Sequence, residues 1–358
     1  MWLFFSLARV TWDKLDSYSF EQYVVDYGKI YESQKETLMR RNIFENKLLQ
    51  VQKHNKEARS WKKGINHFSD RTASELKQMR GIDKATIFHT RHQLGATNPS
   101  TKPWNISTSP RLLDWREKGA VTPVKDQAAC GSCWAFASTE TLESRWFLKT
   151  GELKELSPQF ILDCTPNPHN CGGTGGCNGG TGQLAYNRLA SLGGIPLEND
   201  YPYISGGGKK GKCHDEHFTK KSPAANVTGQ ITVPTNSYEG IMSAIQEGPL
   251  AVSVDASEWH DYESGIFDGG NATNPDLDHL VELVGYGVSF PGGQYFIVRN
   301  SWTAHWGEEG YIRLRRSADF KCGMDVNPSD GDGCKGGPKQ VKVCGQNGIL
   351  YNAVYPQV

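Results

Sequence analysis

The chain of 358 residues lacks the features that mark membrane-spanning and nucleic-acid-binding proteins. No uninterrupted apolar run approaches the ~20 residues that a membrane-spanning helix needs. The 39 basic and 39 acidic residues cancel, so no net positive charge is available to hold nucleic acid or an anionic membrane surface. We therefore expect a globular monomer with no membrane span and no nucleic-acid partner.

The start of the chain holds little of the apolar stretch expected of a secretion signal, although other features suit the secretory pathway. Only Trp2–Ala8 is apolar at the start and Arg9 follows directly, so residues 1–11 are a candidate remnant of a signal segment. Nine cysteines occur, and Asn-x-Ser/Thr sequons begin at Asn105, Asn226 and Asn271. This combination favours a glycoprotein of an oxidising compartment, and the odd number of cysteines leaves at least one thiol unpaired.

Charge is unevenly distributed along the chain. Residues 1–109 hold 18 Lys and Arg against 11 Asp and Glu, a net charge of +7. The totals of 39 and 39 then leave 21 basic and 28 acidic residues in 110–358, a net charge of −7. A basic front segment therefore precedes an acidic body.

Periodicity predicts helices early in the chain and strands late. Apolar residues at three- and four-residue spacing predict two helices between Ser19 and about Lys63, with Gly28 at the break. Another predicted helix, apolar on more than one side and so buried, follows Cys133 and ends at Gly151. β-Branched and aromatic residues predict strands at 250–255, 280–288, 294–299 and 311–316. This order is typical of an α+β protein with two lobes.

A candidate nucleophile lies where a turn enters the predicted buried helix, in Gln127-Ala-Ala-Cys130-Gly-Ser-Cys133-Trp134. A thiol at a helix N-terminus feels the positive end of the peptide dipoles, which favours its thiolate. Spacing alone leaves a second interpretation open, in which Cys130 and Cys133 form a redox pair or half of a metal site. No second Cys-x-x-Cys occurs, and we expect neither a metal nor a cofactor.

His279 and Asn300 are candidate partners for this thiol. His279 opens one predicted strand, and Asn300 directly follows the next. An imidazole at a strand edge can reach a thiol on another lobe, and an amide can orient the ring by accepting from its other nitrogen. Taken alone His279 would be an ordinary histidine, and only its combination with the other two makes it a candidate base.

Together these residues resemble the papain-like cysteine peptidases of the cathepsin L type. His279 lies 146 residues after Cys133, within that family's spacing, whereas Asn300 lies 167 after it, which indicates extra loop. The resemblance extends to Asp114-Trp115-Arg-Glu-Lys-Gly-Ala-Val-Thr-Pro-Val-Lys, Gly176-Cys177-Asn-Gly-Gly180 and Asn300-Ser-Trp302.

The front segment resembles the inhibitory pro-domain of the same family. Gly64-Ile-Asn66-His-Phe68-Ser-Asp70 matches one of its motifs in full. A second motif is spread over Glu36, Arg40, Phe44, Lys47, Val51 and Asn55, with Lys47 in place of the family's Asn. The resemblance implies an inhibitory pro-domain over residues 12–95, a cleavable linker over 96–109 and a mature peptidase over 110–358.

For the mature part, the resemblance implies a two-lobed papain-like fold with a helical left lobe and a β-barrel-like right lobe. It implies a cysteine endopeptidase that acts on proteins and peptides in a lysosome-like or vacuolar compartment, or after secretion, and is inhibited by its own pro-domain. Cys133 would attack the scissile carbonyl as a thiolate, and His279 would protonate the leaving amine. Asn300 would orient His279 under the cover of Trp302, and Gln127 would donate to the oxyanion.

The substrate site implied by the resemblance consists of Gly179, Gly180, Ser253, Leu277, Leu280, Trp302 and Asn352. The two glycines leave room for substrate backbone. Four members, Ser253, Leu277, Leu280 and Asn352, line the pocket for the residue two before the cut. Because none of them is acidic, we expect an aliphatic or aromatic preference.

Three positions depart from the family pattern. Leu280 replaces Ala or Gly beside His279, and Thr303 replaces Gly after Trp302. Glu282 falls within an apolar strand, where a buried carboxylate needs a partner or a raised pKa.

The family pattern also implies disulfides Cys130–Cys177 and Cys164–Cys213, with Cys133 free. The family's right-lobe disulfide is missing, and Asn347 occupies one of its positions. Four further cysteines are associated with insertions at about 165–176 and 317–340, and their pairing stays open: Cys171, Cys322, Cys334 and Cys344.

Three other interpretations compete with an endopeptidase. A catalytically inactive papain-like binding protein is opposed by the presence of Gln127, Cys133, His279 and Asn300 together. An exopeptidase of the same family, in which an insertion or retained peptide blocks one end of the cleft, is opposed by the type of pro-domain. A disulfide-rich adhesion module would differ from both by having no titratable active-site thiol.

Overall fold

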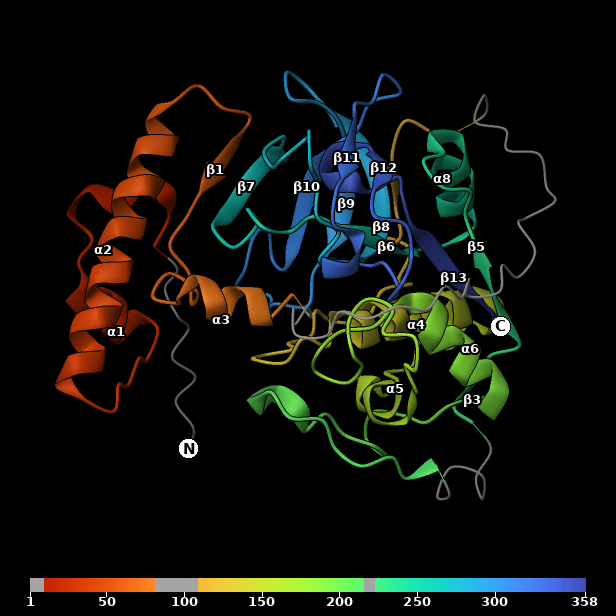
Figure 1. Cartoon of the computed structure of the whole chain (residues 1–358). Helices are drawn as coiled ribbons and strands as arrows, with labels where there is room; N and C mark the ends of the chain where they lie inside the picture. Colours follow the sequence, from red (N-terminus) through yellow and green to blue (C-terminus); the bar gives the residue numbers. More distant parts are fainter. Residues whose placement is uncertain (1–9, 81–108, 216–222) are drawn as a thin grey trace.

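The computed structural model describes residues 10–80, 109–215 and 223–358, and Figure 1 shows their arrangement. The candidate signal remnant and the linker fall almost wholly outside these ranges, as does the sequon at Asn105. No helix among the described residues is both long and apolar enough to cross a membrane.

Residues 10–80 form a helical segment with a small core of its own. Its elements are η1 (Trp12–Ser17), α1 (Phe20–Asp26), α2 (Gln34–Lys56), β1 (Trp61–Lys63) and α3 (Ala73–Gln78). As predicted, the first two α-helices are separated at Gly28, whose φ of 56° suits glycine. The hydroxyls of Ser19 and Ser33 cap these helices by accepting from backbone N–H groups. Tyr23 and Phe44 stack at 4.6 Å in the core between them.

The end of the stretch predicted to be helical is a strand instead. Strand β1 pairs antiparallel with β7 (Tyr262–Phe267), and Trp61 lies opposite Gly265. The Trp61 ring is buried against Phe267, with centroids 4.4 Å apart. The charged pattern was compatible with a helix, but a sheet edge on the body of the protein supplies the backbone partners that decide for a strand.

The helical lobe is organised around one buried helix. It comprises α4 (Cys133–Thr150), α5 (Pro158–Cys164) and α6 (Gly182–Leu192). The residues from Cys133 to Arg145 are all buried, as the apolar pattern predicted, because α4 contacts α5 and α6 on one side and the sheet on the other. The helix ends at Gly151, whose φ of 78° gives a left-handed cap.

The second lobe is built on a sheet with mainly antiparallel neighbours, which has nine strands when β1 of the N-terminal segment is included. Its order is β1-β7-β10-β9-β8-β6-β13-β5, and β2 pairs with β8. Besides β1 and β7 the strands are β2 (Leu113–Asp114), β5 (Gly229–Thr232), β6 (Leu250–Val254), β8 (His279–Ser289), β9 (Gly293–Arg299), β10 (Tyr311–Arg315) and β13 (Ala353–Gln357). The four predicted strands correspond to β6, β8, β9 and β10.

The lobes and the N-terminal helices occupy separate regions of the molecule. Figure 1 shows the sheet above α4, α5 and α6, with α8 (Tyr238–Ala244) beside the sheet. Helices α1 and α2 stand beside the sheet lobe, and α3 leads from them toward the boundary between the lobes. The predicted α+β architecture, two lobes preceded by a helical segment, is confirmed.

All nine cysteines lie within the described residues, where eight form four disulfides and Cys133 is free. Cys130–Cys177 and Cys164–Cys213 are the pairs that the resemblance implied. The two pairs that the sequence left open are Cys171–Cys334 and Cys322–Cys344. The second of these joins the short strands β11 (Cys322–Asp325) and β12 (Val341–Cys344), whereas the first links the two insertions. The small sheet β3 (Gly194–Ile195) with β4 (Ala225–Asn226) completes the fold.

The Glu282 carboxylate, which departs from the apolar pattern of its strand, has the partner that burial requires. Arg299 lies 3.3 Å from Glu282 and 3.3 Å from Glu140, and all three side chains are buried. Ser144 also donates to Glu282 over 2.9 Å. Burial raises the pKa of Glu282, and the Arg299 cation opposes that rise.

Candidate active site

Cys133 is the first residue of α4 and faces the sheet lobe. The end of the helix places its peptide dipoles behind the sulfur. The thiol is buried, with 4% of the residue exposed. Because Cys130 is paired with Cys177, the redox or metal interpretation of Cys130 and Cys133 is wrong. The described residues contain no group of three or more side chains arranged to hold a metal ion.

His279 opens β8 on the opposite lobe and is held on two sides. Its Nε2 lies 2.8 Å from Asn300 Oδ1. The indole of Trp302 stacks on the ring at 4.9 Å, and both side chains are buried. Within the described part of the chain Nδ1 has no hydrogen-bond partner. The structure therefore brings Asn300, Trp302 and His279 together as the resemblance implied.

Both members of the thiol–imidazole pair are uncharged at neutral pH in this form of the protein. Burial raises the pKa of Cys133 to about 12, and the Asp278 carboxylate acts in the same direction. Burial lowers the pKa of His279 to about 4 despite its hydrogen bond to Asn300, and the Arg80 cation lowers it further. A neutral thiol is a weak nucleophile.

The end of the N-terminal segment covers these groups. Gln127 Nε2 donates to the carbonyl of Met79 over 2.6 Å, and the carbonyl of Arg80 lies 3.8 Å from Cys133 Sγ. The Arg80 side chain forms an ion pair of 2.6 Å with Asp278. The donor expected to serve an oxyanion is thus already occupied by the chain's own backbone.

Most of the predicted substrate-binding residues lie together. Gly179, Gly180, Ser253, Leu277 and Leu280 line one cavity with Cys133 and His279. Asn352 lies behind it and donates to Ser253 Oγ over 3.2 Å. Trp302 does not line this cavity. It is covered instead by Phe68 of the N-terminal segment, edge to face at 5.4 Å.

The premise that this pocket contains no acidic residue is wrong. Asp332 lines the same cavity and accepts a hydrogen bond of 2.6 Å from Asn352 Nδ2. Burial raises its pKa, and hydrogen bonds from Ser253 and Asn352 oppose the rise. Asp332 was missed because it belongs to the insertion at about 317–340, where no motif aligns. Cys334 is the nearest sequence signal, and its partner becomes apparent only in the folded chain.

Lys47, the departure from the pro-domain motif, contacts the body of the protein. Its Nζ lies 2.8 Å from Asp261 Oδ2, and Lys63 lies 3.7 Å from the same carboxylate oxygen. Two members of the fully matching motif dock on the same segment, since Asn66 donates to the carbonyl of His260 and Gly64 to that of Asp261. The substitution at Lys47 therefore exchanges an amide for an ion pair across the boundary.

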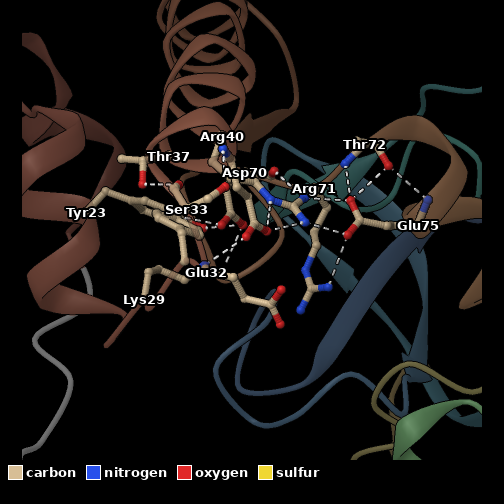
Figure 2. A network of polar contacts seen from close by, with 12 residues as sticks. Tyr23, Lys29, Glu32, Ser33, Thr37, Arg40, Asp70, Arg71, Thr72 and Glu75 are labelled. Atoms are coloured by element: carbon tan, nitrogen blue, oxygen red, sulfur yellow. Dashed lines mark hydrogen bonds and ion pairs between the residues drawn. The ribbon is translucent and has the colours of Figure 1, made fainter.

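Asp70 is the centre of a polar network within the N-terminal segment (Figure 2). It accepts hydrogen bonds from Tyr23, Tyr31 and Lys29, each 2.9 Å long. Burial alone would raise the pKa of Asp70, but the Lys29 cation and these hydrogen bonds outweigh it, so the pKa is lowered. A carboxylate with a lowered pKa stabilises the fold above its reference value of about 4, and this contribution is lost as the pH falls below that value.

Arg40 and Glu75 extend the same network toward α3, as Figure 2 shows. Arg40 contacts Glu75 through two nitrogens, at 2.7 and 2.8 Å, and donates to the backbone carbonyl of Asp70. Thr72 and Glu75 form a capping box at the start of α3. These contacts orient the helix that leads to Met79 and Arg80.

Two of the three predicted sequons are described. Asn226 lies in β4 and Asn271 in a loop, and both residues are exposed. The side chain of Asn271 accepts hydrogen bonds from Thr273, the third residue of its sequon.

The fold and this site define a cysteine protease precursor. The family model of the papain family cysteine proteases matches residues 109–331, and that of the cathepsin propeptide inhibitor domain matches residues 20–76. The chain therefore belongs to the papain family of cysteine proteases and carries its own propeptide inhibitor domain.

Relatives and solved structures agree with this assignment. The chain is 36% identical to cathepsin L of Sarcophaga peregrina over 310 residues, covering 84% of this chain and 88% of the relative. It is 36% identical to fruit bromelain of Ananas comosus over 315 residues, or 86% and 84% of the two chains. A recombinant stem bromelain precursor superimposes with a TM-score of 0.74 at 33% identity, covering 95% of this chain and 97% of that one. Digestive procathepsin L 3 of Tenebrio molitor gives 0.72 at 28%, with 94% and 97% covered.

Proposed function

We propose that the mature part, residues 110–358, is an endopeptidase that cleaves proteins and peptides through a Cys133 acyl-enzyme. The observation that carries the proposal is that a thiol at a helix N-terminus lines one cavity with an imidazole held by Asn300. His279 would accept the thiol proton and pass it to the leaving amine, and Gln127 would donate to the oxyanion. Trp302 would keep water from the contact between His279 and Asn300.

Removal of the pro-domain would switch this chemistry on. Residues 12–95 form the inhibitory part in this proposal, and cleavage falls within 96–109. Release of Met79 would free Gln127 as a donor. Release of Arg80 would admit water to the thiol and the imidazole and remove a cation that disfavours the imidazolium, and both changes favour the ion pair.

The proposed activity is tested by acid activation of the precursor followed by assay on internally quenched peptides blocked at both ends. We expect cleavage within the peptide that an epoxide thiol trap stops, with one equivalent of trap bound at Cys133. No cleavage of a broad blocked-peptide library by processed protein with a titratable thiol would contradict it.

An exopeptidase is a second candidate because the two insertions meet beside the cavity. Cys171–Cys334 joins them, and the Gly172 N–H donates to the carbonyl of Gly333 over 3.0 Å. Gly172 also packs against the carbonyl of Gly180, where substrate backbone was expected to lie. Hydrolysis confined to peptides with a free amino terminus, two residues at a time, would select this candidate.

We also propose that the protein is a monomer, that its sequons are glycosylated, and that it acts in a lysosome-like or vacuolar compartment or after secretion. An oxidising secretory route is supported by four disulfides with one free cysteine. Leu277 and Leu280 give the pocket apolar walls, which supports acceptance of aliphatic or aromatic side chains two residues before the cut.

Part of the interaction that holds the pro-domain on the peptidase is electrostatic in this proposal. Asp261→Asn should speed activation of the full-length precursor about 3- to 10-fold at low salt, because it removes the partner of Lys47 and Lys63. Salt should speed activation of the unmodified precursor more than that of the variant. Acidification toward the carboxylate reference pKa of about 4 should act in the same direction as salt.

The activation rate is measured from the appearance of activity at fixed pH and two salt concentrations. Glu239→Gln is the matched control, because it removes an exposed acid of the same body. Equal activation rates and equal salt responses for Asp261→Asn and the unmodified chain would contradict the electrostatic contribution. Apolar packing alone would then hold the pro-domain on the peptidase.

A further inference from the structure

The pocket beside Cys133 contains the carboxylate of Asp332, which is not one of the residues that the family resemblance placed in its lining. Residues 328–337, here called the strap, carry Asp332 into the cavity that Leu277, Leu280 and Ser253 line. Asn352 donates to its Oδ2 over 2.6 Å. Ser253 also donates to this carboxylate, and two hydrogen bonds still leave acceptor positions on it for a further donor.

The strap is bonded to the opposite lobe, so the position of Asp332 in the cavity is fixed. Cys334, two residues on, is bonded to Cys171. The residues on either side of that cysteine also form backbone hydrogen bonds with the opposite lobe. The carbonyl of Gly333 accepts from the Gly172 N–H, and the Lys335 N–H donates to the carbonyl of His169. A group fixed by covalent and backbone contacts loses little further entropy when a ligand binds.

A cation already lines this cavity in the precursor. The Arg80 side chain lines it together with Asp332, and its Nε lies 2.6 Å from Asp278 Oδ2. The chain thus places a guanidinium among carboxylates next to Cys133 while it is inhibited. This contact is independent of the strap and places a basic side chain in the wall of the same cavity.

The walls of the pocket suit the stem of such a side chain. Leu277 and Leu280 are buried and apolar, whereas Asp332 is a partly buried acidic residue. Arginine and lysine pack their methylene groups on apolar surface while the charged head reaches a polar partner. A planar guanidinium also matches a carboxylate through two parallel hydrogen bonds.

We propose that Asp332 makes this pocket select arginine or lysine two residues before the cut, in addition to the hydrophobic residues that its walls accept. The inference rests on the proposed peptidase function and on the assignment of this cavity to that substrate residue. It reverses the preference against arginine that the sequence suggested.

The test compares Asp332→Asn with the unmodified enzyme, both after pro-domain removal, on blocked dipeptidyl fluorogenic amides that differ only in Arg or Leu at this position. We expect kcat/KM for the Arg substrate to fall about 10- to 100-fold, the worth of a hydrogen bond to a charged group. The value for the Leu substrate should stay within about threefold. Asp330→Asn is the matched control, since it removes a strap charge that does not line the cavity.

An unchanged Arg-to-Leu ratio in Asp332→Asn would overturn the inference while leaving the peptidase function intact, because hydrolysis of the Leu substrate reports that function separately. The double variant Cys171→Ser with Cys334→Ser loosens the strap without altering Asp332, and should reduce the same ratio. Free-amine versions of both substrates complete the test. If Asp332→Asn slows only those, the carboxylate binds the substrate's terminal ammonium and the side-chain assignment is wrong.

Discussion

Cys133→Ala should abolish peptide hydrolysis, lowering kcat by roughly five to six orders of magnitude. The reason is chemical: no other described cysteine is free, and the imidazole of His279 has no other nucleophile to activate in the proposed mechanism. Activity is measured on the fluorogenic amides after the pro-domain has been removed by an added protease. That added cleavage is the control, because it shows that the variant folds and is processed normally.

Substitutions of the partners of Cys133 should reduce activity to an extent that depends on the role of each residue. His279→Ala should be comparably damaging because it removes the group that transfers the proton. Asn300→Ala should cost less, since the amide orients the ring through a 2.8 Å hydrogen bond and transfers no proton itself. Self-processing or peptide hydrolysis retained by Cys133→Ala would refute the proposed mechanism.

Arg299→Met should destabilise the mature domain by about 3 to 5 kcal/mol. The guanidinium lies between Glu140 and Glu282, and its loss leaves two buried carboxylates without their cation. The change would be measured by urea unfolding of a precursor that also carries Cys133→Ser, so that self-digestion does not intervene. Tryptophan fluorescence reports the transition.

The pH dependence of the unfolding free energy of Arg299→Met identifies the cause of its lower stability. Burial raises the pKa of Glu282 above its unfolded value, so the folded state of Arg299→Met keeps the carboxyl protonated at low pH. Stability is then greatest in acid and is lost as the pH rises toward the folded pKa. We expect the defect to grow between pH 5 and pH 8. Replacing Glu140 and Glu282 by Leu in the same variant should restore stability, and a defect that persists would point to packing instead.

The sequence predicted best where one local pattern carries the information. The apolar pattern after Cys133 predicted a buried helix that is apolar on more than one side and ends at Gly151, and α4 is buried from Cys133 to Arg145 and ends at that glycine. Cys133, His279 and Asn300 were found because each lies in a short contiguous motif whose spacing is set by the fold. The sequence left Thr303 unexplained as a replacement for glycine, and its φ of 69° shows why glycine is usual there.

Prediction failed where the partner lies far along the chain. The charged residues around Trp61 were compatible with a helix, and only the edge of β7 makes them a strand. Lys47 was recognisable as a departure from the motif, but its partner Asp261 lies 214 residues away. Neither periodicity nor spacing encodes such a pairing.

The sequence by itself determined the fold class, the order of pro-domain and peptidase, and the thiol, imidazole and amide on which the proposed chemistry rests. The tertiary structure alone placed Asp332 in the cavity beside Cys133. Asp332 lies in an insertion without regular pattern, and its position depends on Cys334 finding Cys171 on the other lobe. A motif reflects interactions between residues that are close in the sequence. The wall of a pocket forms when long loops close on one another, and the sequence does not show where such loops meet.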